Sequence, residues 1–139
     1  MRVREIGEFA LIDRIARAVR RGGVAGGREV VIGIGDDAAV LRPRAGEDVA
    51  VTTDALVEGV HFRWTDEPGP ALGRRAMAAA LSDLAAMGAR PLGVVVALAA
   101  PPGLSLARVD GLLRGLLAAA RRHAAPLVGG NVTLSLIHI

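Results

Sequence analysis

The order of apolar and polar positions predicts a helix followed by strands in the first part of the chain. Apolar residues recur at helical spacing over about residues 6–20, at Phe9, Ile12, Ile15, Ala16 and Val19. The glycine-rich stretch 22–27 is placed to end this helix. Short apolar runs separated by turn residues then predict consecutive strands at 29–35, 38–41 and 49–54.

The next part of the chain predicts a second helix and another strand. Pro68 and Pro70 introduce an alanine-rich helix over 71–87, and Gly88 is placed to end it. The apolar run 91–99 predicts a strand, which the following prolines and glycine break.

A third helix and a last strand complete the pattern. Ser105 is placed as the N-cap of this helix, and a strand starts at Leu127. The helix presents an apolar stripe of Val109, Leu112, Leu113, Leu116 and Leu117. The order of the elements predicts an α/β (α+β) fold, with a mixed sheet and helices on one face.

Composition bounds the size of the protein and its chemistry. The chain has 139 residues, 52% of them hydrophobic, which is enough for one domain with a core. Without lysine it cannot form a P-loop lysine site or a Schiff base. Without cysteine it has no thiolate nucleophile, disulfide or zinc ribbon, and this fits a cytoplasmic protein.

Charge and hydropathy indicate neither nucleic acid nor membrane as a partner. The 17 basic residues are all arginine, the net charge is only +3, and the arginines are scattered rather than gathered in a tract. Aromatic residues make up 2%, so nucleic-acid bases would have little to stack on. The longest apolar run, 94–100, is far shorter than the roughly 20 residues that span a bilayer. The charged start of the chain also lacks the apolar core of a secretory signal.

Carboxylates at the ends of predicted strands are candidate metal ligands. Asp36 and Asp37 follow one strand and Asp54 ends another, beside the hydroxyls of Thr52 and Thr53. Oxygen ligands of this kind favour Mg²⁺ over zinc. The alternative is structural: a loop turn at 36–37 and a helix cap at 54.

Asp83 interrupts an otherwise apolar stretch of the second predicted helix. A purely structural sequence would carry an apolar residue there, so we expect Asp83 to have a partner. That partner is either a metal ion or an arginine such as Arg75 or Arg90. The remaining alternative is an acid on the helix surface.

The glycines after the first predicted strand also match the spacing of a dinucleotide-binding fingerprint. The match at 33–38 is weak, because Asp36 and Asp37 would meet the pyrophosphate. Pro43 also follows too soon for the helix that the fingerprint requires.

A set of motifs in order resembles the thiamine-monophosphate kinase family. They are Gly7-Glu8-Phe9, residues 33–41, residues 52–62, residues 81–89 and Leu127-Val128-Gly129-Gly130-Asn131. The resemblance covers residues 5 to about 133, the amino-terminal half of the family. It implies the fold of the aminoimidazole-ribonucleotide-synthetase superfamily, whose members form a β-barrel across a homodimer and bind ATP near that interface.

The resemblance also implies an activity and a site. The family transfers the γ-phosphoryl group of ATP to thiamine monophosphate, an acceptor that is already ionised, so no general base is expected. Positions of the family's ligands to several Mg²⁺ ions match Asp37, Thr52, Thr53, Asp54 and Asp83, with Asp36 in the same motif. His61 matches a substrate contact, and Gly130 with Asn131 an ATP contact. By itself His61 would be read as a packed or surface residue.

Two features depart from the family. Asn131 stands where the family often has aspartate, so it offers a metal a carbonyl oxygen without charge. Residues 134–139 resemble a translated sequencing adapter, so we expect 1–133 to be the amino-terminal ATP- and Mg²⁺-binding domain of a longer enzyme and inactive alone. Two alternatives stay open, a superfamily member with another phosphoryl acceptor and a non-catalytic dimerisation domain.

Overall fold

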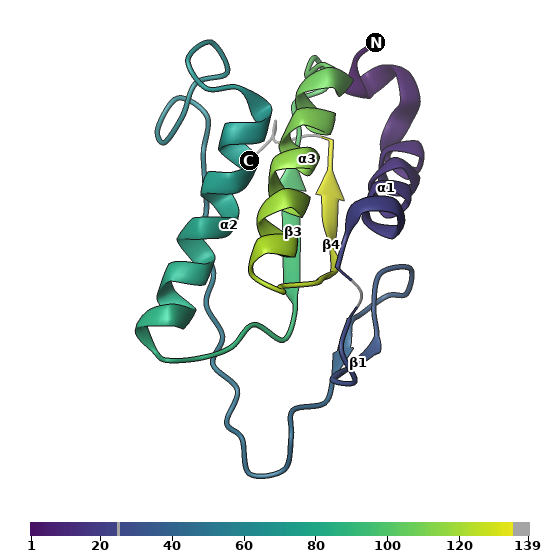
Figure 1. The fold of residues 1–139 in the computed structure, drawn as a ribbon. Helices are drawn as coiled ribbons and strands as arrows, with labels where there is room; N and C mark the ends of the chain where they lie inside the picture. The colour runs from purple at the N-terminus through teal and green to yellow at the C-terminus, as the bar shows by residue number, and fades with distance from the viewer. Residues whose placement is uncertain (25, 135–139) are drawn as a thin grey trace.

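The computed structural model describes residues 1–24 and 26–134, in which helices alternate with short strands (Figure 1). Residues 135–139 of the predicted non-native tail lie outside the described residues. The elements are α1 (Val3–Gly22), β1 (Val30–Ile32), β2 (Val40–Leu41), α2 (Gly69–Ala86), β3 (Val94–Ala99), α3 (Leu106–Arg122) and β4 (Leu127–Thr133). No helix in this described part is long and apolar enough to cross a membrane.

Helix α1 buries only part of its predicted apolar stripe. It begins before the predicted start and bends at Gly7, whose φ is +76°. Leu11 and Val19 are buried, whereas Phe9 is 86% exposed and Ile12 is 41% exposed. The helix packs on α3 and β4 along one side, so the apolar residues that lie off that side remain in solvent.

Helices α2 and α3 pack backbone against backbone through glycines. A Cβ atom added at Gly73 would lie 2.1 Å from the carbonyl oxygen of Leu112, and one added at Gly115 would lie 2.1 Å from that of Pro70. No side chain fits at these crossing points. The glycines therefore set how closely the two helices approach.

The predicted helix-end signals at Gly88 and Ser105 are confirmed. Gly88 has a φ of +66°, and the N–H of Ala89 donates to the carbonyl of Leu84 at 2.8 Å, which is the hydrogen bond of a Schellman motif. At the start of α3, the Ser105 hydroxyl accepts from the N–H of Arg108 at 3.4 Å.

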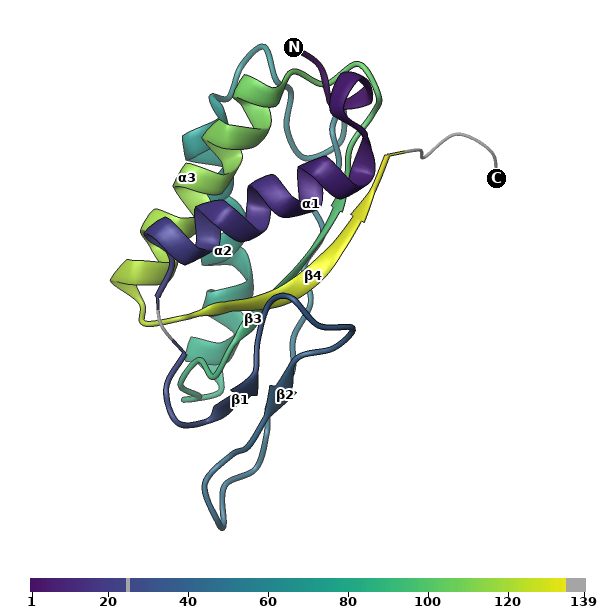
Figure 2. The same cartoon turned by 90° about the vertical axis from the view of Figure 1, so that its right-hand side faces the viewer.

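Strands β3 and β4 are parallel and carry the helices on one face (Figure 2). Val94 and Val96 pack against buried residues of α2 and α3. Val95, which alternates with them, is 66% exposed on the opposite face. The predicted mixed α/β architecture, with helices on one face, is therefore confirmed for these strands.

The prediction of one sheet with a strand at 49–54 is wrong. Strands β1 and β2 pair antiparallel with each other, and β3 and β4 pair separately, as two two-stranded sheets in the described part of the chain. Residues 42–68 form no paired strand apart from an isolated bridge between Glu58 and Phe62. A strand requires a neighbouring strand for its backbone hydrogen bonds. Residues 49–54 have no such neighbour in the described structure, and the side chain of Val51 is 84% exposed.

Candidate functional site

The structure brings together Thr52 and Asp83, two of the predicted metal ligands that lie 31 residues apart. The Thr52 hydroxyl donates to Oδ2 of Asp83 at 2.7 Å. This bond joins the irregular segment 42–68 to α2. It places two oxygen donors of the type that Mg²⁺ prefers side by side.

Asp83 has a partner, as the sequence predicts, but in the structure that partner is the Thr52 hydroxyl rather than Arg75 or Arg90. Its carboxylate is exposed on α2 and accepts from Thr52. Arg75 pairs instead with Glu67 at 2.9 Å, and Arg90 pairs with two other glutamates. Asp83 is also exposed, as the alternative of an acid on the helix surface expected, because the side of α2 that packs on α3 carries Gly69, Gly73 and Met77 instead.

The other predicted acids do not form a cluster with this pair. Asp36, Asp37 and Asp54 are exposed, and the N–H of Asp37 donates to Oδ1 of Asp36 at 2.9 Å. Among residues 1–24 and 26–134, no group of three or more His, Asp or Glu side chains could hold a metal ion. The metal-ligand assignment, including Thr53 beside Thr52, therefore stays a prediction.

His61 lies in a tight turn beside a polar cavity of about 500 Å³. The ring nitrogen Nδ1 accepts from the N–H of Val57 at 3.1 Å. Nη2 of Arg75 donates to the carbonyl oxygen of His61 at 2.9 Å. The residues that line the cavity are Gly59, Val60, His61, Phe62, Arg63, Asp66, Glu67 and Arg75. The predicted substrate residue therefore faces a space that mixes cations and carboxylates.

An aromatic pair anchors the same loop to α3. The rings of Phe62 and Trp64 meet edge to face with centroids 5.3 Å apart, and the guanidinium of Arg108 lies 5.5 Å from the Trp64 ring centroid. Trp64 also packs against buried residues of the core. Aromatic contacts of this kind add about 0.5–1.5 kcal/mol beyond area burial.

Gly130 and Asn131 lie on β4, away from the His61 loop in sequence. A Cβ atom at Gly130 would lie 2.1 Å from the carbonyl oxygen of Val96, so glycine is required there by the strand itself. The Asn131 side chain is exposed and donates from Nδ2 to the Thr133 hydroxyl at 3.3 Å.

The loop after Asp36 and Asp37 ends beside β4. A Cβ atom built on Gly129 of β4 would lie 3.9 Å from the methyl group of Ala39.

A network of ion pairs holds the β1–β2 hairpin against the connection between α2 and β3. Arg90 contacts Glu29 at 3.3 Å and Glu47 at 2.7 Å, and Arg44 contacts Glu29 at 3.3 Å. A hydrogen bond to its own backbone and the charges of Arg90 and Arg44 lower the pKa of Glu29. The network thus ties together segments that flank the loop of Asp36 and Asp37.

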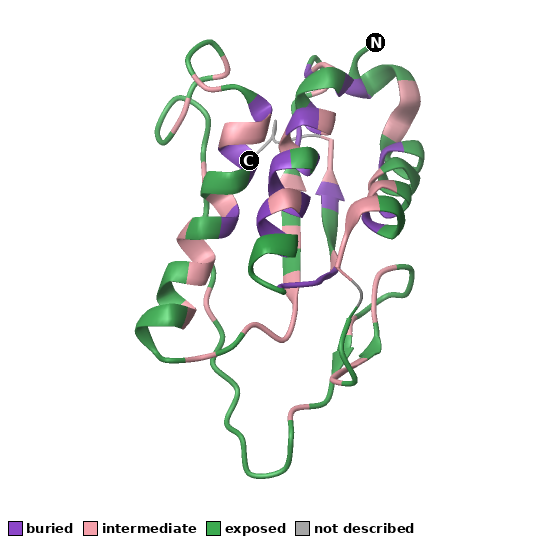
Figure 3. Ribbon diagram, viewed as in Figure 1, coloured by how far each residue is buried: buried purple, intermediate pink, exposed green. Residues whose placement is uncertain are grey.

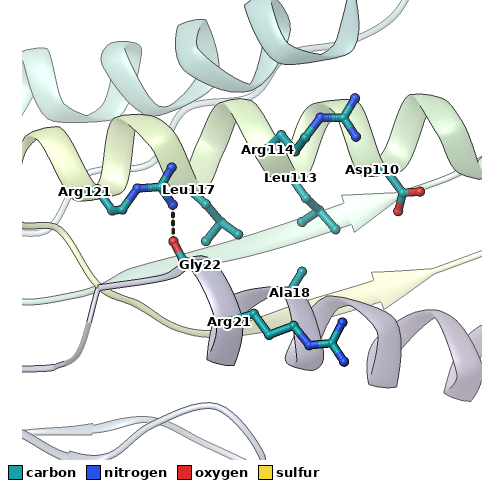
Figure 4. A pocket seen from close by; sticks show the side chains of 8 residues that line it. All are labelled: Ala18, Arg21, Gly22, Asp110, Leu113, Arg114, Leu117 and Arg121. Atoms are coloured by element: carbon teal, nitrogen blue, oxygen red, sulfur yellow. Dashed lines mark hydrogen bonds between the residues drawn. The ribbon is translucent and has the colours of Figure 1, made fainter.

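A second cavity, of about 430 Å³, lies between α1 and α3 and contains none of the predicted site residues (Figure 4). Its arginines are Arg21, Arg114 and Arg121. Arg121 donates to the carbonyl oxygen of Gly22, so it closes the carboxyl end of α1. Asp110, also in the lining, is neutralised by Arg14. The predicted site residues His61, Thr52 and Asp83 lie at the other cavity and at the Thr52–Asp83 contact rather than here.

Residues 35–138 match the family described as AIR synthase related protein, N-terminal domain. The chain belongs to this family. Its relatives include thiamine-monophosphate kinases from Synechococcus elongatus, 46% identical over 73% of this chain, and from Mycobacterium tuberculosis, 38% identical over 94%. The Escherichia coli K12 enzyme of the same name is 37% identical over 91% of the chain.

Solved structures of the family superpose on the chain. Thiamine-monophosphate kinase from Stenotrophomonas maltophilia K279a matches with a TM-score of 0.69 at 40% identity, over 94% of this chain and 39% of that one. A second structure, AaThiL complexed with AMPPCP and TMP, matches with a TM-score of 0.59 at 31% identity, over 97% of this chain and 40% of that one. The chain spans only 31–37% of the length of the curated relatives named above.

Proposed function

We propose that this chain is the amino-terminal part of an enzyme that transfers the γ-phosphoryl group of ATP to thiamine monophosphate, giving thiamine diphosphate and ADP. The observation that carries the proposal is the identity of 37–46% to thiamine-monophosphate kinases over most of the chain. A related structure complexed with AMPPCP, an ATP analogue, and TMP supports the choice of substrates.

The chemistry asks the protein to position two anions rather than to move a proton. The acceptor phosphate is already ionised near neutral pH, so catalysis rests on holding donor and acceptor in line and neutralising charge. Within this chain, which has no lysine, arginines and bound metal ions would supply the positive charge. His61, in its polar cavity, is the proposed contact to thiamine monophosphate, and Gly130 with Asn131 the proposed contact to ATP.

Several Mg²⁺ ions are part of the proposal, and the donor set fits them. The residues that would hold them are Asp36, Asp37, Thr52, Thr53, Asp54 and Asp83, all of which offer oxygen. Protein sites for magnesium–nucleotide complexes commonly supply one or two carboxylates, with phosphates completing the shell. A group of three protein acids is therefore not needed. When bound, the ions would neutralise charge on the transferred phosphoryl group.

Activity of the full-length protein tests this proposal. Incubation with ATP, Mg²⁺ and thiamine monophosphate should form thiamine diphosphate, and chromatography would measure this product. Asp54→Asn and Asp83→Asn should each reduce turnover by roughly a hundredfold or more while the circular dichroism spectrum stays unchanged. The matched control is Asp48→Asn, an exposed aspartate of the same segment, which should keep wild-type turnover.

Other outcomes would separate the alternatives. Phosphorylation of a different acceptor would identify another superfamily activity. Failure to bind ATP with Mg²⁺ would favour a non-catalytic dimerisation domain. Turnover retained in both variants at saturating Mg²⁺ would overturn the metal-ligand assignment.

The same proposal includes a cytoplasmic location. It also includes a homodimer with a β-barrel formed across the interface. The support for the dimer is the uncovered outer face of β3, where Val95 is 66% exposed, and the unpaired segment around Val51. Both would be covered by strands of a second copy. At micromolar concentration, sedimentation velocity of residues 1–133 should give a dimer or an aggregate. Val95→Glu should weaken association, Phe9→Glu on α1 should not, and a stable wild-type monomer would contradict the proposal.

A further inference from the structure

One guanidinium nitrogen joins the His61 turn to α2. Nη2 of Arg75 carries two N–H groups, and its two acceptors are the carbonyl oxygen of His61 at 2.9 Å and Oε2 of Glu67 at 2.9 Å. Arg75 lies about two helical turns before Asp83 on α2. A single side chain therefore fixes the loop to the helix that carries a proposed metal ligand.

The turn itself fixes the orientation of the His61 ring. Gly59 has a φ of +82°, and its N–H donates to the carbonyl of Phe62 at 2.8 Å. The N–H of His61 donates to the carbonyl of Val57 at 2.8 Å, while the N–H of Val57 donates to Nδ1 of the same histidine at 3.1 Å. Reciprocal bonds of this kind hold the ring against its own backbone.

The bond to Nδ1 also decides which ring nitrogen carries the proton. A nitrogen that accepts from a backbone N–H has no proton of its own, so the neutral His61 ring carries its proton on Nε2. The side chain is exposed and lies in the wall of the polar cavity. It therefore offers an N–H donor there rather than a base.

We propose that Arg75 is a positioning residue for His61: it holds the 57–62 turn so that Nε2–H donates to the phosphate of the acceptor substrate. The inference rests on the proposed function for the identity of that substrate. Arg75 is not itself assigned to the phosphate, because both N–H groups of its Nη2 are taken by the turn and by Glu67, and Glu67 already pairs with its charge. Its effect on substrate passes through the histidine.

Arg74 supplies a matched control. It is the exposed neighbour of Arg75 on α2, and no ion pair or side-chain hydrogen bond is found for it among the described residues. In the full-length enzyme, Arg75→Met should raise KM for thiamine monophosphate roughly tenfold, which corresponds to a loss of about 1.4 kcal/mol of substrate binding. KM for ATP should stay within about twofold. Arg74→Met should change neither constant, and both variants should have wild-type circular dichroism.

A double-mutant cycle tests whether Arg75 acts through His61. In a His61→Ala background, Arg75→Met should add less than about a twofold effect on KM for thiamine monophosphate. Arg75→Lys, which keeps the charge near Glu67, should give an intermediate KM. Independent, multiplying effects of the two substitutions, or equal effects of the Arg74 and Arg75 variants, would overturn the proposal.

The histidine tautomer gives a readout that does not depend on turnover. Nitrogen-15 NMR of labelled His61 in the full-length protein should show an unprotonated Nδ1 and a protonated Nε2, and Arg75→Met but not Arg74→Met should mix the tautomers. An unchanged tautomer in Arg75→Met would contradict the positioning role. Absence of thiamine-monophosphate phosphorylation by wild type would instead count against the proposed function, and the NMR result would still decide the role of Arg75.

Discussion

Two regions of the molecule differ sharply in how they are held together. Helices α2 and α3 with strands β3 and β4 form a layered unit whose inner residues are buried, whereas the segment 42–68 is mostly exposed (Figure 3). Leu116 and Leu113, on α3, are 4% and 5% exposed, while Val51 and Val60 are 84% and 75% exposed. Apolar side chains are thus used as core in one region and left in solvent in the other.

The difference matters because the predicted site is divided between the regions. Asp83 and Gly130 belong to the layered unit, whereas Thr52 and His61 belong to the exposed segment. Contacts such as Thr52–Asp83 and Arg75–His61 fasten the segment to the unit. The unit is therefore the packed part of the molecule, and a few polar contacts attach to it the segment that carries Thr52 and His61.

The largest expected effect is a loss of folding on closing the glycine contact between α2 and α3. Gly73→Ala would place a methyl group 2.1 Å from the Leu112 carbonyl oxygen, and backbone cannot move aside as a side chain can. We expect unfolding free energy to fall by about 3 kcal/mol or more, measured by urea denaturation. At Gly103 an added Cβ meets nothing within 4 Å. The unfolding free energy of Gly103→Ala should therefore be within about 0.5 kcal/mol of the wild-type value. Equal effects at the two glycines would disprove the close helix crossing.

A pair of apolar truncations measures the contrast between the regions directly. Leu113→Ala removes a side chain that is 5% exposed and should lower the unfolding free energy by about 2–4 kcal/mol. Val51→Ala, at 84% exposure, should change it by less than about 0.5 kcal/mol. Calorimetry under conditions where the protein is monomeric is the measurement. A large effect of Val51→Ala there would show that the segment belongs to the core.

A moderate, pH-dependent effect on stability is expected where α1 meets the layered unit. Arg14 donates to both carboxylate oxygens of Asp110 at 2.6 Å, and this hydrogen bonding lowers the pKa of Asp110 below 3.8. Asp110→Asn should lower the unfolding free energy by about 1 kcal/mol at pH 7. The effect is no larger because the side chains of Arg14 and Asp110 are partly exposed.

The sign of the pH dependence follows from the lowered pKa. The carboxylate stabilises the fold at pH values above its unfolded pKa, and this contribution is lost as pH falls through the lower folded pKa. Wild type and Asp110→Asn should therefore converge in stability as pH falls below about 4. Asp13→Asn, in the exposed pair with Arg17, should cost less than about 0.5 kcal/mol. A difference that grows in acid would contradict the assignment.

The smallest expected effect on global stability lies in the ion pairs of Arg90. Arg90→Met removes contacts to Glu29 and Glu47 but no buried apolar area, so unfolding free energy should change little. Limited proteolysis within residues 42–68 should nevertheless become several times faster, because local opening of the segment becomes easier. The control is Arg42→Met, an exposed arginine beside β2. Unchanged cleavage rates would show that the ion pairs do not restrain the segment.

The helices, most of the strands and the family can be predicted from the sequence. Local signals carried this information: Gly88 and Ser105 mark helix ends through backbone conformation and capping, and the α3 stripe from Val109 to Leu117 is buried or half-buried as its spacing predicts. The four-residue spacing of Gly69 with Gly73, and of Gly111 with Gly115, was also a readable signal for close helix packing. This spacing does not decide the packing by itself, because the same glycines are compatible with weak helices.

The tertiary structure sets the partners of the predicted site residues. Thr52 meets Asp83 across 31 residues and Arg75 meets His61 across 14, and such contacts depend on how the chain packs rather than on any local period. It also decided that 49–54 is not a strand here, since residues that favour a strand still need a neighbouring backbone with which to form hydrogen bonds. Helices satisfy their hydrogen bonds internally and can be recognised from short stretches, whereas strands and polar sites depend on parts of the molecule that sequence spacing does not identify.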